Sequence, residues 1–166
     1  MTKEKMYNEV VEYILENRER FYRFAFSYTK DKETALDVVQ SSICKALEKY
    51  TDIRDVTKVN SWFYKVLLNE TYSQLKKNNR EIATAGEEMP EGIYTESAYD
   101  KDDELYFRIN SLPKELKTII ILRFFEDLPL SDIAVITKTN LNTVKTRLYS
   151  ALKKLKRIYE EAGADD

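Results

Sequence analysis

The chain has 166 residues, of which 43% are hydrophobic and 34% charged, and its formal net charge is −2, so it can form a core and carries no overall basic excess. It has no histidine and one cysteine, Cys44, which excludes a zinc site of the usual Cys/His kind, a nucleophile activated by histidine and an intramolecular disulfide. Only three Gly and three Pro occur, which favours long helices over a turn-rich β fold.

We expect a cytoplasmic protein, because no apolar run approaches the roughly 20 residues that span a bilayer and the N-terminal segment lacks a signal-peptide core. We also expect no catalytic activity, no metal site and no cofactor, because no carboxylate pair, metal cluster or Gly-rich phosphate loop stands out. Cys44 falls within a helical pattern, which favours a buried, unreactive side chain.

Residues 5–78 have the apolar periodicity of three helices. The polar break DKET at 31–34 supplies N-cap candidates for the second helix. The polar segment TDIRDVTKVN at 51–60 predicts a loop before the third helix, at 61–77. The predicted apolar positions are Met6, Val10, Tyr13, Ile14, Phe21, Phe24, Ala25 and Tyr28 in the first helix, Leu36, Val39, Ile43, Leu47 and Tyr50 in the second, and Phe63, Val66, Leu67 and Leu75 in the third.

The third predicted helix, SWFYKVLLNETYSQLKK, interleaves aromatic residues with lysines. Aromatic rings give unpaired bases a stacking surface worth about 1–3 kcal/mol per base, and lysines follow the phosphate backbone. Aromatic residues at helical spacing are more often part of a core, and Phe63, Val66 and Leu67 are assigned to it. Taken alone, this pattern favours burial of the aromatic residues in the hydrophobic core over stacking on bases.

Residues 81–104, EIATAGEEMPEGIYTESAYDKDDE, contain nine acidic residues, one lysine and no apolar period. We interpret 79–103 as a flexible acidic linker between two small helical domains, at 5–78 and 104–160. The alternative is a long surface loop within a single domain.

In the second domain, LPKELKTIIILRFF at 112–125 predicts a buried helix. Its three consecutive isoleucines also fit a buried strand, but its length and the flanking Ser111 and Pro113 favour a helix. A short helix at 130–136, a polar turn at 137–140 and a longer helix follow. This is the spacing of a helix-turn-helix, whose second helix enters the major groove of DNA.

The last predicted helix is basic and amphipathic. Residues 133–159 contain seven Lys or Arg and no Asp or Glu, whereas an ordinary soluble helix mixes charges to gain i,i+4 pairs. We therefore predict DNA contact rather than a solvated basic face. The predicted apolar stripe is Leu141, Val144, Leu148, Leu152 and Leu155. Asn142, Thr143, Lys145, Thr146 and Tyr149 lie in the turns that reach base edges, and Lys153, Lys154 and Arg157 lie further along, where they meet phosphate.

In this order and spacing, the motifs resemble those of bacterial RNA polymerase sigma factors of the extracytoplasmic-function class, in the sigma-70 superfamily. The likeness spans about residues 9–78 and 103–159. Its markers are DVVQ at 37–40, the helix SWFYKVLLNETYSQLKK, LP at 112–113, IA at 133–134 and TVKTRL at 143–148.

The resemblance implies an all-α protein with a region 2-like helical domain and a region 4-like helix-turn-helix domain, which binds core RNA polymerase and promoter DNA and takes no small-molecule substrate. It implies polymerase contact through Asp37, Gln40 and Ser41, opposite the predicted apolar positions Leu36, Val39 and Ile43. The loop at 51–60 would capture a flipped base of the melted −10 element. The −10 residues implied are Asn60, Trp62, Tyr64, Lys65 and Asn69. The DNA-contacting residues predicted in the last helix, together with Arg147, are implied to read the −35 element of the promoter. A membrane-bound anti-sigma factor is implied as a further partner.

Two other functions remain open from the sequence. A stand-alone helix-turn-helix regulator would bind an operator as a dimer and footprint DNA without polymerase. A helical adaptor that binds only protein would have no salt-dependent DNA affinity.

Overall fold

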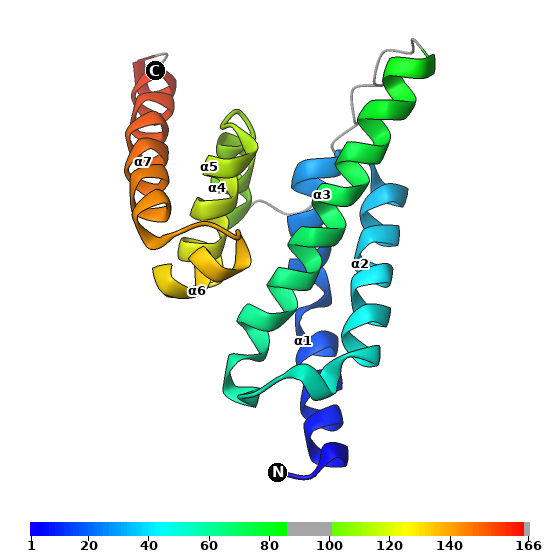
Figure 1. Cartoon of the computed structure of the whole chain (residues 1–166). Helices are drawn as coiled ribbons and strands as arrows, with labels where there is room; N and C mark the ends of the chain where they lie inside the picture. Colours follow the sequence, from blue (N-terminus) through cyan, green and yellow to red (C-terminus); the bar gives the residue numbers. More distant parts are fainter. Residues whose placement is uncertain (86–100, 165–166) are drawn as a thin grey trace. The chain divides into compact units, whose positions relative to one another are not determined.

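The computed structural model describes the backbone of residues 1–85 and 101–164 and the side chains of residues 1–78 and 104–163. The chain divides into two compact units, Met1–Ile93 and Tyr94–Asp166. Within the described residues both units are built from helices, and no strand occurs (Figure 1). The all-α fold with two small helical domains is therefore confirmed.

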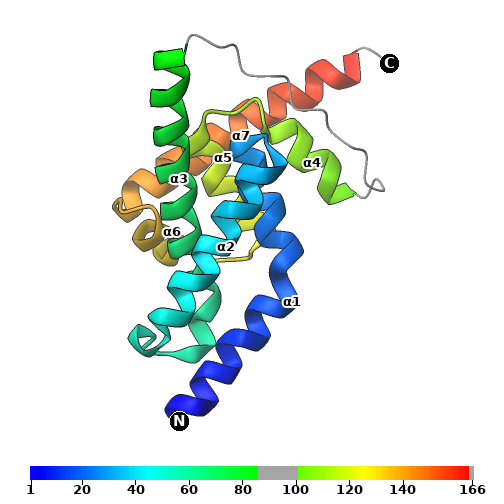
Figure 2. The same ribbon diagram turned by 90° about the vertical axis from the view of Figure 1, so that its right-hand side faces the viewer.

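The first unit is a bundle of three helices. These are α1 (Lys3–Thr29), α2 (Lys32–Glu48) and α3 (Val59–Ala85). Each helix packs against the other two (Figures 1 and 2). Two 3₁₀ turns, η1 (Tyr50–Asp52) and η2 (Val56–Lys58), lie between α2 and α3, where the sequence predicts a loop.

Aromatic rings form the centre of the first core. Phe63 of α3 stacks on Phe21 of α1 with ring centroids 4.2 Å apart. Tyr64 meets Phe24 edge-on at 5.4 Å, and all four side chains are fully buried. Such pairs add roughly 0.5–1.5 kcal/mol each beyond the area that they bury, so α1 and α3 are held together mainly through these rings.

The prediction that Leu36 lies on the apolar face of α2 is wrong, because its side chain is 49% exposed. The buried residues of α2 are Ala35, Val38, Val39, Ser42 and Ala46. Three of these five side chains are small, and the helix is rotated so that the larger Leu36 faces solvent.

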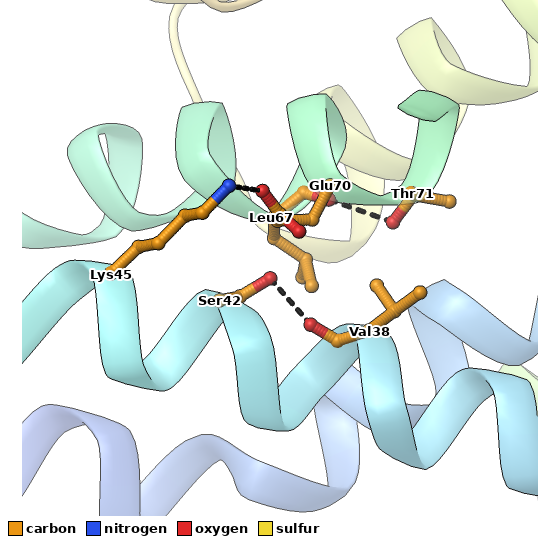
Figure 3. A network of polar contacts seen from close by, with 6 residues as sticks. All are labelled: Val38, Ser42, Lys45, Leu67, Glu70 and Thr71. Atoms are coloured by element: carbon orange, nitrogen blue, oxygen red, sulfur yellow. Dashed lines mark hydrogen bonds and ion pairs between the residues drawn. The ribbon is translucent and has the colours of Figure 1, made fainter. Parts of the chain in front are cut away.

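Polar side chains between α2 and α3 are satisfied within the bundle (Figure 3). The buried Ser42 hydroxyl donates to the Val38 carbonyl at 2.7 Å, and the buried Thr71 hydroxyl donates to the Leu67 carbonyl at 2.7 Å. Because each hydroxyl bonds within its own helix, neither adds an unsatisfied group to the core. At the edge of the interface, the Lys45 ammonium of α2 pairs with the Glu70 carboxylate of α3.

Asp31 caps α2, which confirms the N-cap expected at 31–34. Its carboxylate accepts from the Thr34 N–H at 2.9 Å and also from the Thr34 hydroxyl. These hydrogen bonds hold the pKa of the Asp31 carboxyl below its usual value.

Replacing Asp31 with alanine should lower the free energy of unfolding by about 1 kcal/mol, measured by urea denaturation.

The capping contribution has a defined pH dependence. Because the folded-state pKa is lowered, the contribution is complete above the ordinary Asp pKa of about 4 and is lost as the pH falls through the folded-state value. Asp31→Asn, which keeps a capping oxygen, is the matched control and should retain most of the stability at neutral pH. Equal denaturation midpoints for wild type and Asp31→Ala at pH 7 would contradict this assignment.

The second unit contains four described helices and a π turn. These are α4 (Lys101–Ile109), α5 (Lys114–Ile120), the π turn η3 (Ile121–Phe125), α6 (Leu130–Ile136) and α7 (Leu141–Ala164). Ile119, Ile120 and Ile121 are fully buried in helical backbone, so the buried helix predicted at 112–125 is confirmed over the strand. The π turn was not predicted.

The helices extend further than the sequence predicts. The helix α3 continues to Ala85 and α4 begins at Lys101, so helical backbone covers both ends of the predicted linker at 79–103. The rest of that linker, residues 86–100, lies outside the described residues.

Candidate nucleic-acid interface

The short helix α6 and the long helix α7 are joined by a hydrogen-bonded turn. Lys138 takes a left-handed conformation with φ 57°, and the Thr139 N–H donates to the Ala134 carbonyl at 3.0 Å. The Asn140 side chain then accepts from the Thr143 N–H at 2.8 Å and caps the start of α7. This local bonding fixes the direction in which α7 leaves the turn.

Most of the predicted contact residues of α7 are accessible. Asn142, Lys145, Thr146, Tyr149 and Lys153 are exposed, and Thr143 and Arg147 are half-buried. Tyr149, at 75% exposed, presents its ring to solvent. The Thr146 hydroxyl donates to the Asn142 carbonyl at 2.9 Å. The accessible side chains combine cations with hydrogen-bonding groups, which suits a helix that meets phosphates and base edges.

The apolar stripe of α7 differs from the prediction. Leu141 and Leu152 are 39% and 42% exposed, whereas Ala151, like Val144, is fully buried. The helix packs against α5 and α6, and its rotation buries the small Ala151 and leaves Leu152 partly exposed. The packed stripe is Val144, Leu148, Ala151, Leu155 and Ile158, of which the three larger residues after Val144 are half-buried.

In the first unit, Trp62, Lys65 and Asn69 follow one another at helical spacing along α3. Asn69 is exposed, while Trp62 and Lys65 are half-buried. Asn60 is half-buried at the start of the helix, and its side-chain oxygen accepts from the Ser61 N–H at 2.9 Å. These four residues leave part of their surface accessible to a ligand.

Tyr64 does not belong with this set. Its side chain is fully buried and contacts the rings of Phe21 and Phe24. The prediction that Tyr64 contacts DNA is wrong, because residues 63, 64, 67 and 68 of α3 are the ones that face the core.

The loop between α2 and α3 is ordered by its own short-range contacts. Ile53 is buried at 5% exposed and fixes the middle of the loop. The Asp55 carboxylate accepts from the Thr57 hydroxyl and N–H, which hold the pKa of that carboxyl below its usual value. Arg54 is exposed beside them. The loop thus presents polar side chains from a defined backbone.

Asp37, Gln40 and Ser41 are all exposed on α2. They share this face with Leu36 and Cys44, which were predicted on the buried side, and the Gln40 amide lies 3.8 Å from the Cys44 sulfur. Cys44 is therefore exposed, contrary to the expected burial. The face combines polar groups with two less polar side chains, a mixture common at protein interfaces.

None of the helices in the described part of the chain has the length and apolar character that crossing a bilayer requires. Across the same described residues, no three His, Cys, Asp or Glu side chains gather where they could hold a metal ion.

Two segments of the chain match known sequence families. Sigma-70 region 2 matches residues 13–81, and Sigma-70 region 4 matches residues 102–155. The RNA polymerase sigma factor SigV of Bacillus subtilis (strain 168) is 46% identical over 141 residues, covering 84% of each chain. The ECF RNA polymerase sigma factor SigW of the same organism is 21% identical over 155 residues, covering 84% of this chain and 83% of that protein.

The chain belongs to the ECF class of RNA polymerase sigma factors. As a sigma factor it directs promoter-specific initiation of transcription, which confirms the resemblance seen in the sequence. It is therefore neither the stand-alone regulator nor the protein-only adaptor that the sequence left open.

Two solved structures share the fold of this sigma factor. One is the sigma factor RpoE in complex with the anti-sigma factor NepR from Bartonella quintana, with a TM-score of 0.78 at 24% identity, covering 90% of this chain and 95% of that chain. The other is CnrH in complex with the cytosolic domain of CnrY, with a TM-score of 0.63 at 15% identity, covering 92% and 88%.

Proposed function

We propose that this sigma factor binds core RNA polymerase through α2, reads the −35 element as duplex with α7, and holds the −10 element as a melted strand with α3 and the preceding loop. The observation that carries the proposal is the accessible face of α7 from Leu141 to Tyr159, which lies in a 27-residue segment, 133–159, without one carboxylate. Neither a catalytic group nor a cofactor is required.

The −35 assignment rests on the shape and charge of the helix-turn-helix. A major groove about 12 Å wide accepts one α-helix. The capped start of α7 places Asn142, Lys145 and Tyr149 in its first turns, where a recognition helix meets base edges. Lys153 lies about three turns from the start, where contact with phosphate adds affinity without sequence preference.

The −10 assignment rests on α3 and the loop at 51–60. The Trp62 ring is accessible enough to stack on an unpaired base, and Lys65 lies near enough along the helix to meet the same strand's phosphate. An ordered polar loop before this helix can receive a base that has left the stack. Asn60 and Asn69 complete this proposed strand-binding set, without Tyr64.

We assign polymerase binding to the face of α2 that contains Asp37, Gln40 and Ser41, and we add Leu36 as an apolar contact within it. Because the target polymerase is cytoplasmic, we place the protein there. The RpoE relative is bound to an anti-sigma factor and the CnrH relative to a cytosolic domain. By analogy, an anti-sigma factor held at the membrane would restrain this chain.

The polymerase assignment is tested by co-purification of the full chain with core RNA polymerase. The double variant Asp37→Ala, Gln40→Ala should bind core polymerase at least about tenfold more weakly, because truncating a single hot-spot residue at the centre of an interface costs about 2 kcal/mol or more. Glu12→Ala, an exposed change on α1, is the control. Equal affinity of the double variant and the control for core polymerase would refute this assignment.

A further inference from the structure

The first turns of α1 lie outside the segment that matches Sigma-70 region 2. The helix begins at Lys3, and the Thr2 hydroxyl caps it by accepting from the Lys5 N–H at 3.2 Å. The match to region 2 begins only at residue 13. Residues 3–12 are therefore an ordered helical segment without an assigned role.

This segment packs against the loop proposed to hold a −10 base (Figures 1 and 2). The Tyr7 ring meets the Tyr50 ring edge-on, with centroids 5.2 Å apart and an interplanar angle of 74°. Val10, one turn further along α1, is fully buried. Tyr50 is the first residue of η1, so Tyr7 contacts the loop where it leaves α2.

The same helix also contacts the start of α3, just after the loop. The Tyr13 ring lies edge-on to the Phe63 ring, with centroids 6.1 Å apart and an interplanar angle of 68°. Phe63 follows Trp62 near the start of α3. The first half of α1 thus contacts the leading end of the loop through the Tyr7 ring and the start of α3 through the Tyr13 ring.

Both 3₁₀ turns of the loop, η1 and η2, contact α1. Three backbone hydrogen bonds within the loop are short-range, from the Asp52 N–H to the Lys49 carbonyl, from the Ile53 N–H to the Tyr50 carbonyl and from the Lys58 N–H to the Asp55 carbonyl. Ile53 is the one residue of 51–60 that is buried. Because the Tyr50 carbonyl accepts from the Ile53 N–H, the position of Tyr50 influences the placement of the exposed residues that follow it.

We propose that Tyr7 is a positioning residue for −10 recognition, and this inference rests on the proposed function of the loop. Tyr7 acts through the Tyr50 ring and does not touch DNA. It fixes the leading end of the loop, so that the loop discriminates among the bases of the melted −10 strand. The aromatic ring of Tyr7 makes the contact with Tyr50, and the Tyr7 hydroxyl is not needed for it.

The test measures base preference with holoenzyme reconstituted from core RNA polymerase and the full chain. Binding is compared on four fork-junction DNAs that differ only in the −10 base captured by the loop. Tyr7→Ala should reduce the preference for the best base about 3- to 10-fold, the range expected for one aromatic pair. Tyr7→Phe should keep the wild-type preference, because it retains the ring.

Further variants separate positioning from simple loss of stability. Partial unfolding would weaken binding to all four DNAs equally and leave the preference unchanged. Leu15→Ala, at a site on α1 that is 61% exposed, is the matched control and should behave as wild type. Combining Tyr7→Ala with Tyr50→Ala should reduce the preference no further than Tyr50→Ala alone, because both changes remove one interaction.

The outcomes distinguish this inference from the function on which it rests. A wild-type holoenzyme with no preference among the four DNAs would overturn the proposed function of the loop. A wild-type preference that Tyr7→Ala leaves intact would overturn the positioning role alone. Loss of preference in both Tyr7→Ala and Tyr7→Phe would overturn the assignment to the ring.

Discussion

Replacing Phe63 with alanine should destabilise the first unit by about 3–5 kcal/mol, the usual result of truncating a fully buried phenylalanine. Phe63 stacks on Phe21 and also meets Tyr13 edge-on, so its removal leaves a cavity lined by rings that cannot close it easily. Because small domains have a free energy of unfolding of only about 5–15 kcal/mol, this single change should bring the unit close to unfolding.

The chain offers a local probe for this measurement. Trp62 is its only tryptophan and lies in the first unit, so its fluorescence reports the urea unfolding of that unit. Leu15→Ala, at a position in α1 of the same unit that is 61% exposed, is the matched control and should shift stability by less than about 0.5 kcal/mol. A Phe63→Ala midpoint equal to that of the control would contradict the described core.

Two substitutions in α7 should weaken promoter binding in different ways. Asn142→Ala, in the first turn, should lower the preference for the cognate −35 sequence about 5- to 150-fold, corresponding to a base contact of roughly 1–3 kcal/mol. Lys153→Ala should weaken binding to all sequences alike and reduce the salt dependence of log K by about one unit of slope.

Both effects are measured with holoenzyme on cognate and altered −35 duplexes across a salt series. Lys3→Ala, at an exposed lysine at the start of α1, is the control for loss of one positive charge. If Asn142→Ala and Lys153→Ala changed affinity and salt slope in the same way, the division of α7 into a base-reading start and a phosphate-binding remainder would be wrong.

Much of the fold could be predicted because its large apolar residues recur at helical spacing. The errors have a common physical cause. At Leu36 and Leu152 a large apolar residue was assigned to the core, whereas the small residues Ala35, Ser42 and Ala151 are the ones that are fully buried. Small residues at helix contacts carry little apolar signal, so a pattern built from large residues misjudges the rotation of the helix.

Tyr64 illustrates the same limit in the candidate site. Three aromatic residues in succession, from Trp62 to Tyr64, leave the rotation of α3 ambiguous, because each residue is displaced by about 100° around the helix from the one before. The buried contacts with Phe21 and Phe24 settle which of them faces inwards. The packing of Tyr7 on Tyr50 could not be predicted, since it joins residues 43 positions apart in the sequence.

Run-off transcription by core RNA polymerase on a promoter library, with and without the full chain, tests the central claim most directly. We expect the chain to create new start sites, each downstream of a shared pair of −35 and −10 sequences. Asn142→Ala should then relax the −35 requirement and Trp62→Ala should impair opening at −10. Start sites that are the same with and without the chain would contradict the account.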